Sequence, residues 1–321
     1  MRVVLPLLVA LAVAIAMMRP APAQDTDDKS RAYSTIDVTP PGTLDPQPLP
    51  PLANPNAPKL PAMELFGRSE TPVPGPARPI GAYANGCLAG AQSLPITGPT
   101  WQVMRLSRNR NWGTPRLVEF LERLGDNAKK GGWNGLLIGD MSQPRGGPMT
   151  TGHASHQIGL DVDVWFTPMP DHVLSREERE EDSAVNVVAP DGLDVDKAWT
   201  PAHMEVVKAA AEDPLVTRIF VNAAIKKKMC SDAGTDRAWL AKVRPWWGHA
   251  EHFHVRLACP PEAHDCKSQP PVPPGDGCGH ALDFWFKPGI LHPPPPKGPP
   301  ARRKLTLAKM PPACREVVKA P

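Results

Sequence analysis

Two short segments rich in histidine and carboxylate hold the residue types that can carry out chemistry. The first is HASHQIGLDVDVW at residues 153–165, and the second is RPWWGHAEHFHVR at residues 244–256. A single histidine is more often a satisfied core or surface residue than a ligand. Two clusters of histidine and carboxylate in one chain favour a metal site instead, because neutral imidazole is the commonest protein ligand for metals.

The spacing within these segments places their polar side chains together. Polar and apolar residues alternate at residues 161–166 and 251–257, which predicts a strand at the end of each segment. Side chains two apart on a strand point to the same face, so His252 and His254 should share a face. Asp161 and Asp163 should share a face of their own strand for the same reason.

A zinc hydrolase needs three nitrogen or oxygen ligands and an open fourth position for water. His156 lies seven residues before Asp163, and Gly159 between them permits a turn that brings both side chains to one point. We expect His156, Asp163 and His254 to bind one active-site Zn²⁺. The ion would lower the pKa of its water toward about 7 and polarise the scissile carbonyl.

The remaining histidines of the second segment suit proton transfer. His252 lies beside a ligand and is expected to take or give a proton, which typically contributes ~10²–10⁴-fold to the rate. His249 is expected to stabilise the developing oxyanion or to share the proton work. Trp246 and Trp247 either wall the cleft or are core aromatics, and the sequence leaves both readings open. No G-x-S-x-G elbow or H-E-x-x-H helix offers another catalytic group.

The elements around these segments predict an α+β fold. Helices are expected from Thr114-Pro115 and Thr200-Pro201, where an N-cap residue precedes a first-turn proline. Short apolar strands are expected at residues 135–139 and 216–221. Helices mixed with non-repeating strands indicate a single compact domain, residues 81–287, with a mainly antiparallel sheet flanked by helices.

Both ends of the chain have a different composition from the domain. Residues 1–23 have a charged start, an apolar run and an Ala-Pro-Ala exit, which predicts a secretory signal peptide cleaved after Ala23. An uncleaved anchor is the alternative, but the apolar run is shorter than the ~20 residues that span a bilayer. We therefore expect an exported protein without a membrane span after cleavage.

Much of the proline content lies outside the domain. The chain has 43 prolines. Residues 24–80 are expected to form a Pro-rich linker, because such a composition cannot bury enough apolar surface to offset its ordering entropy. Residues 288–321 form a Pro-rich tail, which a cross-link through Cys314 would tie to the domain.

Cysteine content and net charge bear on the compartment of the protein and on its class of partner. The six cysteines form an even set without a CxxC pair, so three disulfides are expected in an oxidising compartment, with fifteen pairings open. The formal net charge of +3 falls to +1 when the signal peptide removes Arg2 and Arg19. That balance excludes the basic footprint of a nucleic-acid-binding protein.

Several strings resemble the penicillin-insensitive murein endopeptidases over about residues 81–286. They are GHASHQ and GLDVD at residues 152–163, RPW with HxHVR at residues 244–256, and the shorter strings GDM (139–141), YANGC (83–87) and DAGTDR (232–237). That family belongs with the lysostaphin-type and D-Ala-D-Ala metallopeptidases, which share a small α+β zinc fold. The resemblance implies the same ligand order as assigned above.

The resemblance also implies a substrate, a location and an assembly. It implies a periplasmic enzyme that cleaves the D-alanyl–meso-diaminopimelyl cross-links of peptidoglycan and is insensitive to β-lactams, which have no serine to acylate. It further implies a homodimer with a second metal near His153, for which Asp191 and Asp194 are the candidate partners. Here the chain departs from the family pattern, since an aspartate stands about where a histidine is expected. The implied disulfides are Cys87–Cys314, Cys230–Cys278 and Cys259–Cys266.

Two other functions fit the same residues. A D,D-carboxypeptidase of the same superfamily would trim terminal D-alanine, and only the length of the pocket separates it from an endopeptidase. A non-catalytic zinc module would bind cell wall without cutting it. The presence of His252 beside a full ligand set argues against the non-catalytic module.

Overall fold

The computed structural model describes residues 49–292 and 305–321. The predicted signal peptide and the first part of the predicted linker lie outside these ranges. Within them, no helix combines the length and apolar character needed to cross a bilayer.

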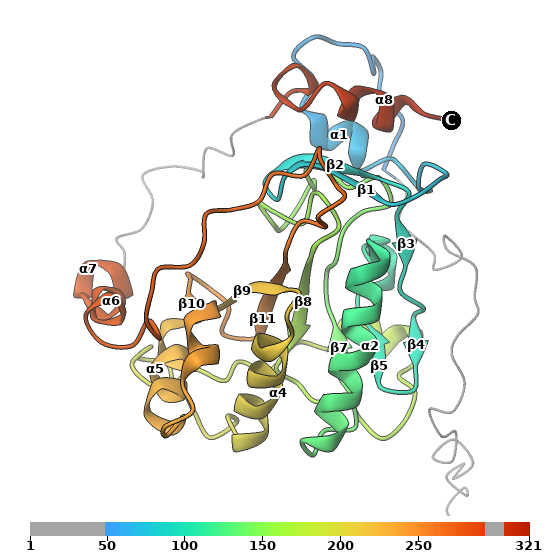
Figure 1. Cartoon of the computed structure of the whole chain (residues 1–321). Coiled ribbons are helices and arrows are strands. Elements are labelled where there is room, and N and C mark those ends of the chain that lie inside the picture. The colour runs from blue at the N-terminus through green and yellow to red at the C-terminus, as the bar shows by residue number, and fades with distance from the viewer. Residues whose placement is uncertain (1–48, 293–304) are drawn as a thin grey trace, which may run out of the picture.

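A seven-stranded mixed sheet forms the centre of the fold (Figure 1). Its strands in spatial order are β10 (Val243–Pro245), β9 (Val216–Val221), β11 (His252–Leu257), β8 (Asp161–Trp165), β7 (Leu136–Ile138), β5 (Trp101–Val103) and β4 (Thr97–Gly98). The pairs β10–β9 and β5–β7 are parallel, whereas the other four pairs are antiparallel. Antiparallel pairing therefore predominates, as the sequence predicts, but the sheet is mixed.

The two predicted long helices are confirmed. They are α2 (Pro115–Lys130) and α4 (Pro201–Glu212), each preceded by a threonine and each starting with proline. Proline suits the first helical position because its missing N–H would be unpaired there in any case. The two helices pack against each other, and α4 also packs on β9 (Figure 1). Leucine and phenylalanine side chains from α2 fill the core at helical spacing: Leu117, Phe120, Leu121 and Leu124.

A smaller layer covers one end of the sheet. It contains the hairpin β1 (Arg78–Ala82) and β2 (Asn85–Ala89), with α1 (Ala62–Phe66) and α8 (Ala313–Lys319) above it (Figure 1). The strands β3 (Gln92–Ser93) and β6 (Trp112–Gly113) pair beside it. This layer has its own apolar cluster, which includes Ala62, Phe66, Ile80, Met310 and Val317.

The prediction of a linker at residues 24–80 is therefore wrong for the last part of that range, which is folded. Ala62 and Phe66 are fully buried, and β1 begins at Arg78, although both lie within the predicted linker at 24–80. The tail supplies the apolar surface that this segment lacks in its own sequence, and Cys314 fixes the tail to Cys87 in β2. The folded unit thus extends beyond residues 81–287 at both ends.

The other helices are short. They are α3 (Arg176–Glu181), α5 (Ala223–Asp232), α6 (His280–Asp283) and α7 (Pro288–Leu291), with 3₁₀ turns at Leu106–Arg108, Ala238–Lys242, Phe284–Phe286 and Leu307–Lys309. The charged segment at α3 is not wholly a solvated surface, because Arg179 is buried and donates to Thr97 Oγ1 and Gln102 Oε1.

Three disulfides join the pairs that the resemblance implies. Cys87 pairs with Cys314, Cys230 with Cys278, and Cys259 with Cys266. The first closes a separation of 227 residues and connects the two ends of the folded unit. The second attaches the segment before α6 to α5.

Candidate metal centre

The two histidine–carboxylate segments meet on neighbouring central strands. β11 pairs with β8 in antiparallel register, and this register places His254 directly opposite Asp163. His252 and Asp161 lie two positions from these residues and share their faces, as alternation requires. The same-face prediction is confirmed by contacts of Asp163 with both His252 and His254.

His156 reaches the same point from the loop before β8. Its backbone has φ 63°, in the left-handed region that side-chain-bearing residues rarely adopt. Three hydrogen bonds hold this conformation: His156 N donates to Asp161 Oδ2, His156 O accepts from Ser142 Oγ, and its ring Nδ1 donates to Met141 O. The last bond leaves Nε2 as the free nitrogen. Such over-determined strain is typical of functional sites.

The turn that the sequence predicts at Gly159 is present. Gly159 has φ 68°, and a Cβ there would lie 2.4 Å from a methyl group of Leu88. Only glycine therefore permits this turn, because it combines a left-handed backbone with close packing. The turn directs the chain from His156 into β8.

Three side-chain atoms converge at the centre of the site. His156 Nε2 lies 3.1 Å from His254 Nδ1 and 3.4 Å from Asp163 Oδ1. His254 Nδ1 lies 3.1 Å from Asp163 Oδ1. All three side chains are buried. Two imidazole nitrogens and one carboxylate oxygen at this spacing are a donor set that suits a catalytic zinc ion.

The charge state of Asp163 also fits a cation. Burial raises the pKa of its carboxyl, but His156, His252 and His153 outweigh burial and hold that pKa well below its usual value. Asp163 Oδ1 is buried and has no hydrogen-bond donor among the described residues. A buried anionic oxygen without a donor costs free energy unless a cation compensates it.

Asp161 and Arg256, which lie behind His254, orient its ring. Its Nε2 lies 3.2 Å from Asp161 Oδ1, and Arg256 binds both oxygens of Asp161 from Nε and Nη2 at 2.7 and 3.2 Å. Burial lowers the pKa of His254, but the carboxylates of Asp161 and Asp163 raise it to about 9. A carboxylate behind a ligand histidine fixes the orientation of the ring and raises its basicity as a ligand.

His153 lies beside this set and pairs with two carboxylates. Its Nδ1 is 3.3 Å from Asp163 Oδ2, and its Nε2 is 2.9 Å from Asp140 Oδ2. Burial lowers its pKa, but Asp163 and Asp140 raise it above the ordinary value. His153, His156 and Asp163 also have the spacing of a metal group. Since both ring nitrogens of His153 already face carboxylates, it fits an ion pair better than a ligand role.

The residues expected to complete a second metal site do not join His153. The group of histidines and carboxylates with metal-binding spacing in the described chain contains neither Asp191 nor Asp194. These two aspartates instead accept hydrogen bonds from the neighbouring backbone N–H groups of Leu193 and Val195. Both aspartates are exposed, and their carboxylates are hydrogen-bonded within their own loop in the described part of the chain.

Asp140 is a site residue for which no role was predicted from the sequence. It lies two residues after the end of β7, and its buried carboxylate binds Arg110 Nη1 at 2.7 Å and Arg108 Nη1 at 3.1 Å in addition to His153. Burial raises the pKa of Asp140, but His153 and Arg110 hold it well below its usual value. The available signal was a carboxylate immediately after the apolar strand predicted at residues 135–139.

The two histidines expected to move protons lie at the edge of the centre. His252 is partly exposed, and its Nε2 lies 3.7 Å from Asp163 Oδ2. The ring of His249 lies 4.9 Å from that of His252, and its Nδ1 donates to Trp247 O at 2.8 Å. Burial and then His252 lower the pKa of His249 to about 4. His249 is therefore neutral near pH 7, with Nε2 as its acceptor nitrogen.

A cavity of about 610 Å³ opens beside His153. Its walls come from four separate parts of the chain: α1, the β1–β2 hairpin, the loop around His153 and the C-terminal tail. They include Met63, Asn85, Met149, Gln157, Leu305 and Lys309. The tail therefore helps to shape the space next to the metal centre.

Trp246 and Trp247 directly follow β10. They are 48% and 51% exposed, which excludes the alternative that they are core aromatics. Trp246 packs on Phe220, which in turn contacts the ring of His254. The prediction that they border the cleft agrees with these contacts.

The chain also matches known proteins over this fold. A family model described as penicillin-insensitive murein endopeptidase matches residues 79–319. The chain belongs to this family. A penicillin-insensitive murein endopeptidase of Haemophilus influenzae is 46% identical over 261 residues, which cover 78% of this chain and 86% of the relative. Proteins of the same name from Klebsiella pneumoniae and Salmonella typhi are each 46% identical over 248 residues, covering 77% of this chain and 88% of the relative.

Membership in the murein endopeptidase family makes the chain an enzyme of the peptidase class. The family match runs from β1 to the end of α8 and so includes the C-terminal tail. The β1–β2 hairpin and α8 are thus part of the unit that this family shares, in agreement with the Cys87–Cys314 bridge, whereas α1 precedes the match.

Proposed function

We propose that this chain is a zinc-dependent murein endopeptidase that hydrolyses D-alanyl–meso-diaminopimelyl cross-links of peptidoglycan in the periplasm. The observation that carries the proposal is the convergence of His156 Nε2, Asp163 Oδ1 and His254 Nδ1 at mutual distances of 3.1–3.4 Å. We assign the domain to the fold of the lysostaphin-type and D-Ala-D-Ala metallopeptidases. Adjacent central strands carrying the HxxxxxxD and HxH segments support that assignment.

The donor set fits zinc better than a hard cation. Two imidazoles and one carboxylate suit zinc, whereas magnesium and calcium prefer all-oxygen sites. The ligand nitrogens are also fixed from behind, since Met141 O holds His156 and Asp161 holds His254. When bound, the ion supplies Lewis-acid activation of water and of the scissile carbonyl.

The histidines of the chain supply the proton transfers. His252 is the group we assign to take a proton from the attacking water and return it to the leaving amine, because it is partly exposed and lies beside the ligand Asp163. His249 donates from Nδ1 to Trp247 O, so its free Nε2 is an acceptor. This arrangement favours a share in proton transfer over the alternative role of an oxyanion donor.

Endopeptidase activity requires room on both sides of the scissile bond. The cavity beside His153 offers space next to the centre, and the exposed Trp246, which reaches His254 through Phe220, borders a second open region. A carboxypeptidase would need space on one side only. These two open regions support cleavage within a cross-link over removal of a terminal D-alanine.

Digestion of purified peptidoglycan tests the proposal. The enzyme is incubated with sacculi in the presence or absence of a chelator, and the products are identified by mass spectrometry. We expect cross-linked dimers to be converted into monomers, the conversion to stop with chelator and to return with zinc, and penicillin to have no effect. Release of free D-alanine without loss of cross-links would overturn the endopeptidase assignment, and full activity in chelator would overturn the zinc assignment.

Export can be tested separately. Cell fractionation should place the protein in the periplasm, and N-terminal sequencing of that material should begin at Gln24, directly after the predicted cleavage site. Material that begins at Met1 and stays with the membrane would instead support an uncleaved anchor.

A further inference from the structure

Aromatic side chains gather on the surface beside the candidate metal centre. Trp246 and Trp247 are 48% and 51% exposed, Phe284 is 42% exposed, and Trp285 is half-buried. The rings of Trp247 and Trp285 lie 4.7 Å apart, those of Trp246 and Trp247 5.3 Å apart, and those of Phe284 and Trp285 5.9 Å apart. We refer to Trp246, Trp247, Phe284 and Trp285 as the aromatic shelf.

The shelf is continuous with the centre. Trp246 contacts Phe220 at 5.8 Å between ring centroids, and Phe220 contacts the ligand histidine His254 at 5.4 Å. The carbonyl of Trp247 accepts the hydrogen bond from His249. A molecule lying on the shelf would therefore contact Trp247, which binds His249 directly, and Trp246, which reaches His254 through Phe220 alone.

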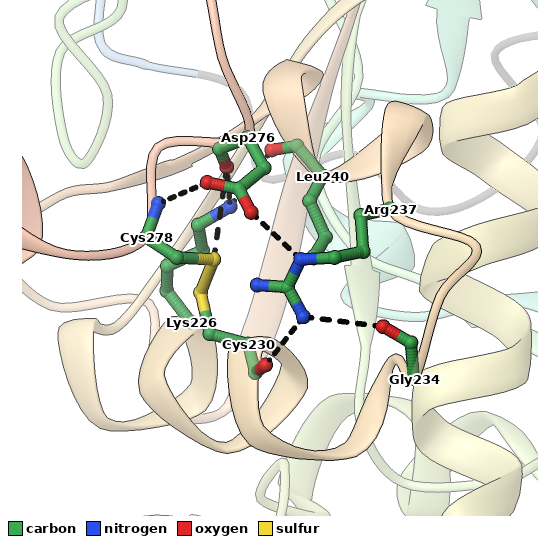
Figure 2. The surroundings of a disulfide bond; sticks show 7 residues. All are labelled: Lys226, Cys230, Gly234, Arg237, Leu240, Asp276 and Cys278. Atoms are coloured by element: carbon green, nitrogen blue, oxygen red, sulfur yellow. Dashed lines mark hydrogen bonds and ion pairs between the residues drawn. A yellow bond between two sulfur atoms is a disulfide. The ribbon is translucent and has the colours of Figure 1, made fainter.

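Phe284 and Trp285 of the shelf are held in place by an anchor, the segment around residues 276–278. The Cys230–Cys278 disulfide ties the preceding segment to α5, and Asp276 accepts from Arg237 Nε at 2.8 Å (Figure 2). The buried Lys226 Nζ donates to the carbonyls of Asp276 and Leu240 at 2.6 and 2.8 Å (Figure 2). Three of these interactions, the disulfide and the two bonds to Asp276, hold one short segment and fix its path before α6.

Close packing reinforces this anchor. Gly277 has φ 71°, and a Cβ there would lie 2.8 Å from a guanidinium nitrogen of Arg244, the residue two before Trp246. The segment before Trp246 and the segment before Phe284 thus pack against each other, in addition to the contact between the Trp247 and Trp285 rings. α6 packs against α5, near the sheet edge formed by β10, the strand that Trp246 follows (Figure 1).

Exposed, pre-positioned indoles are unusual on a protein surface. Large exposed apolar residues that cluster mark a binding site, whereas scattered ones need no explanation. Tryptophan presents a broad face with negative potential and loses little conformational entropy on binding. Pyranose rings have a complementary face of polarised C–H groups. Peptidoglycan, the substrate class proposed above, presents such rings directly next to its peptide stems.

We propose that the aromatic shelf binds an N-acetylated sugar ring of the murein glycan strand while the attached cross-link occupies the metal centre. This inference rests on the proposed function for its choice of ligand. The shelf would hold the strand on which the peptide stem is carried, so that the enzyme prefers cross-links in intact murein over free peptides.

A binding measurement tests this without any hydrolysis. Peptide-free glycan strands are prepared by amidase treatment of sacculi, and their affinity for the full chain is measured by tryptophan fluorescence and by isothermal titration calorimetry. We expect the wild-type protein to bind and Trp285→Ala to bind about tenfold or more weakly, as expected for loss of an aromatic anchor. The control is Val173→Ala, at an exposed apolar residue that follows His172, whose carbonyl accepts from Gln102 in β5. This variant should bind like the wild type.

The outcomes separate this inference from the proposed function. Glycan binding that Trp285→Ala weakens, in the presence or absence of chelator, supports the shelf even if cross-link hydrolysis is not observed. No binding of the wild type to glycan strands, or equal binding by Trp285→Ala, would overturn the inference and leave the hydrolase proposal intact. Binding of the shelf to anionic phospholipid vesicles instead of glycan, or its burial in a dimer by analytical ultracentrifugation, would also overturn it.

Since Trp285→Ala could disturb the local fold, a second variant keeps the test decisive. Trp285→Phe retains an aromatic ring at the same position and should recover most of the glycan affinity. Melting temperatures of both variants within a few degrees of the wild type would show that the anchor at Cys230–Cys278 is intact.

Discussion

His254 and Asp163 face each other across the β11–β8 pair, with His254 Nδ1 3.1 Å from Asp163 Oδ1. The antiparallel register of β11 and β8 therefore brings these two site residues together. It joins two residues separated by 91 positions in the sequence without any long side-chain reach. Opposed residues on an antiparallel pair have Cβ atoms only about 5 Å apart, so both side chains can donate to one ion.

Substitution of Asp163 by asparagine should remove the negative ligand while keeping its shape. We expect metal content after dialysis to fall to background and peptidoglycan hydrolysis to fall by more than about 100-fold, because the ion supplies several kcal/mol of catalysis. Metal is measured by plasma mass spectrometry. Asp171→Asn, on an exposed carboxylate that pairs with His172, is the control. Full metal occupancy and activity in Asp163→Asn would contradict the ligand assignment.

His252→Ala should separate metal binding from turnover. Because its Nε2 faces the distal oxygen of Asp163 and not the converging atoms, we expect the variant to keep its metal. The rate of cross-link hydrolysis should fall by about 10²–10⁴-fold, the typical contribution of a general acid–base group. His172→Ala serves as a matched histidine control on the surface. Retention of wild-type turnover by His252→Ala would refute the proton-transfer role.

Arg256→Lys tests the residues behind His254. The guanidinium of Arg256 binds both oxygens of Asp161 and also lies over the rings of Tyr83 and Phe220. Lysine keeps the charge but loses the fork, so Asp161 should hold His254 less firmly. We expect zinc affinity, measured by chelator competition, to fall by about 10–100-fold. A fall in activity at saturating zinc without a change in affinity would assign Arg256 to another role.

Lys226 should make stability depend on pH. Burial, and then Arg244, lower the pKa of its ammonium to about 7 in the folded protein, against 10.5 in the unfolded chain. Between pH 7 and 10.5 the unfolded chain binds more protons, so stability rises with pH across this window, by up to about 1.4 kcal/mol per pH unit. We expect the melting temperature of the wild type, relative to Lys226→Met, to increase from pH 7 to pH 9.

The comparison with Lys226→Met isolates this effect, since the other groups titrate alike in both proteins. A difference in melting temperature that is constant from pH 7 to pH 9 would show that the ammonium keeps its ordinary pKa. A difference that shrinks would contradict the direction of the shift.

The Cys87–Cys314 bridge should contribute more stability than the Cys259–Cys266 bridge. Their sequence separations are 227 and 7, and in the chain-entropy account the longer loop constrains the unfolded state by about 3 kcal/mol more. Paired Cys→Ser variants are compared by denaturant unfolding. Loss of the longer bridge should also release α8 and expose Phe66 to proteolysis. Equal losses of stability in the two variants would contradict this account.

Local patterns were enough to predict several elements and the residues of the centre. The threonine–proline starts of α2 and α4 and the alternation in β8 and β11 depend only on neighbours in the chain. The same alternation placed His252 with His254 and Asp161 with Asp163. These features are set by caps and by the period of two, which act within a few residues.

Only the tertiary structure decided which distant residues became partners. The register that opposes His254 to Asp163, the pairing of Asp140 with His153, and the Arg256 fork on Asp161 all depend on how strands far apart in sequence align. The burial of Phe66 depends likewise on a tail that returns over 200 residues later to be fixed at Cys314. Such contacts are set by packing of the whole core, whose free energy no local segment contains. The sequence therefore indicated the candidate ligands, while the fold determined their geometry.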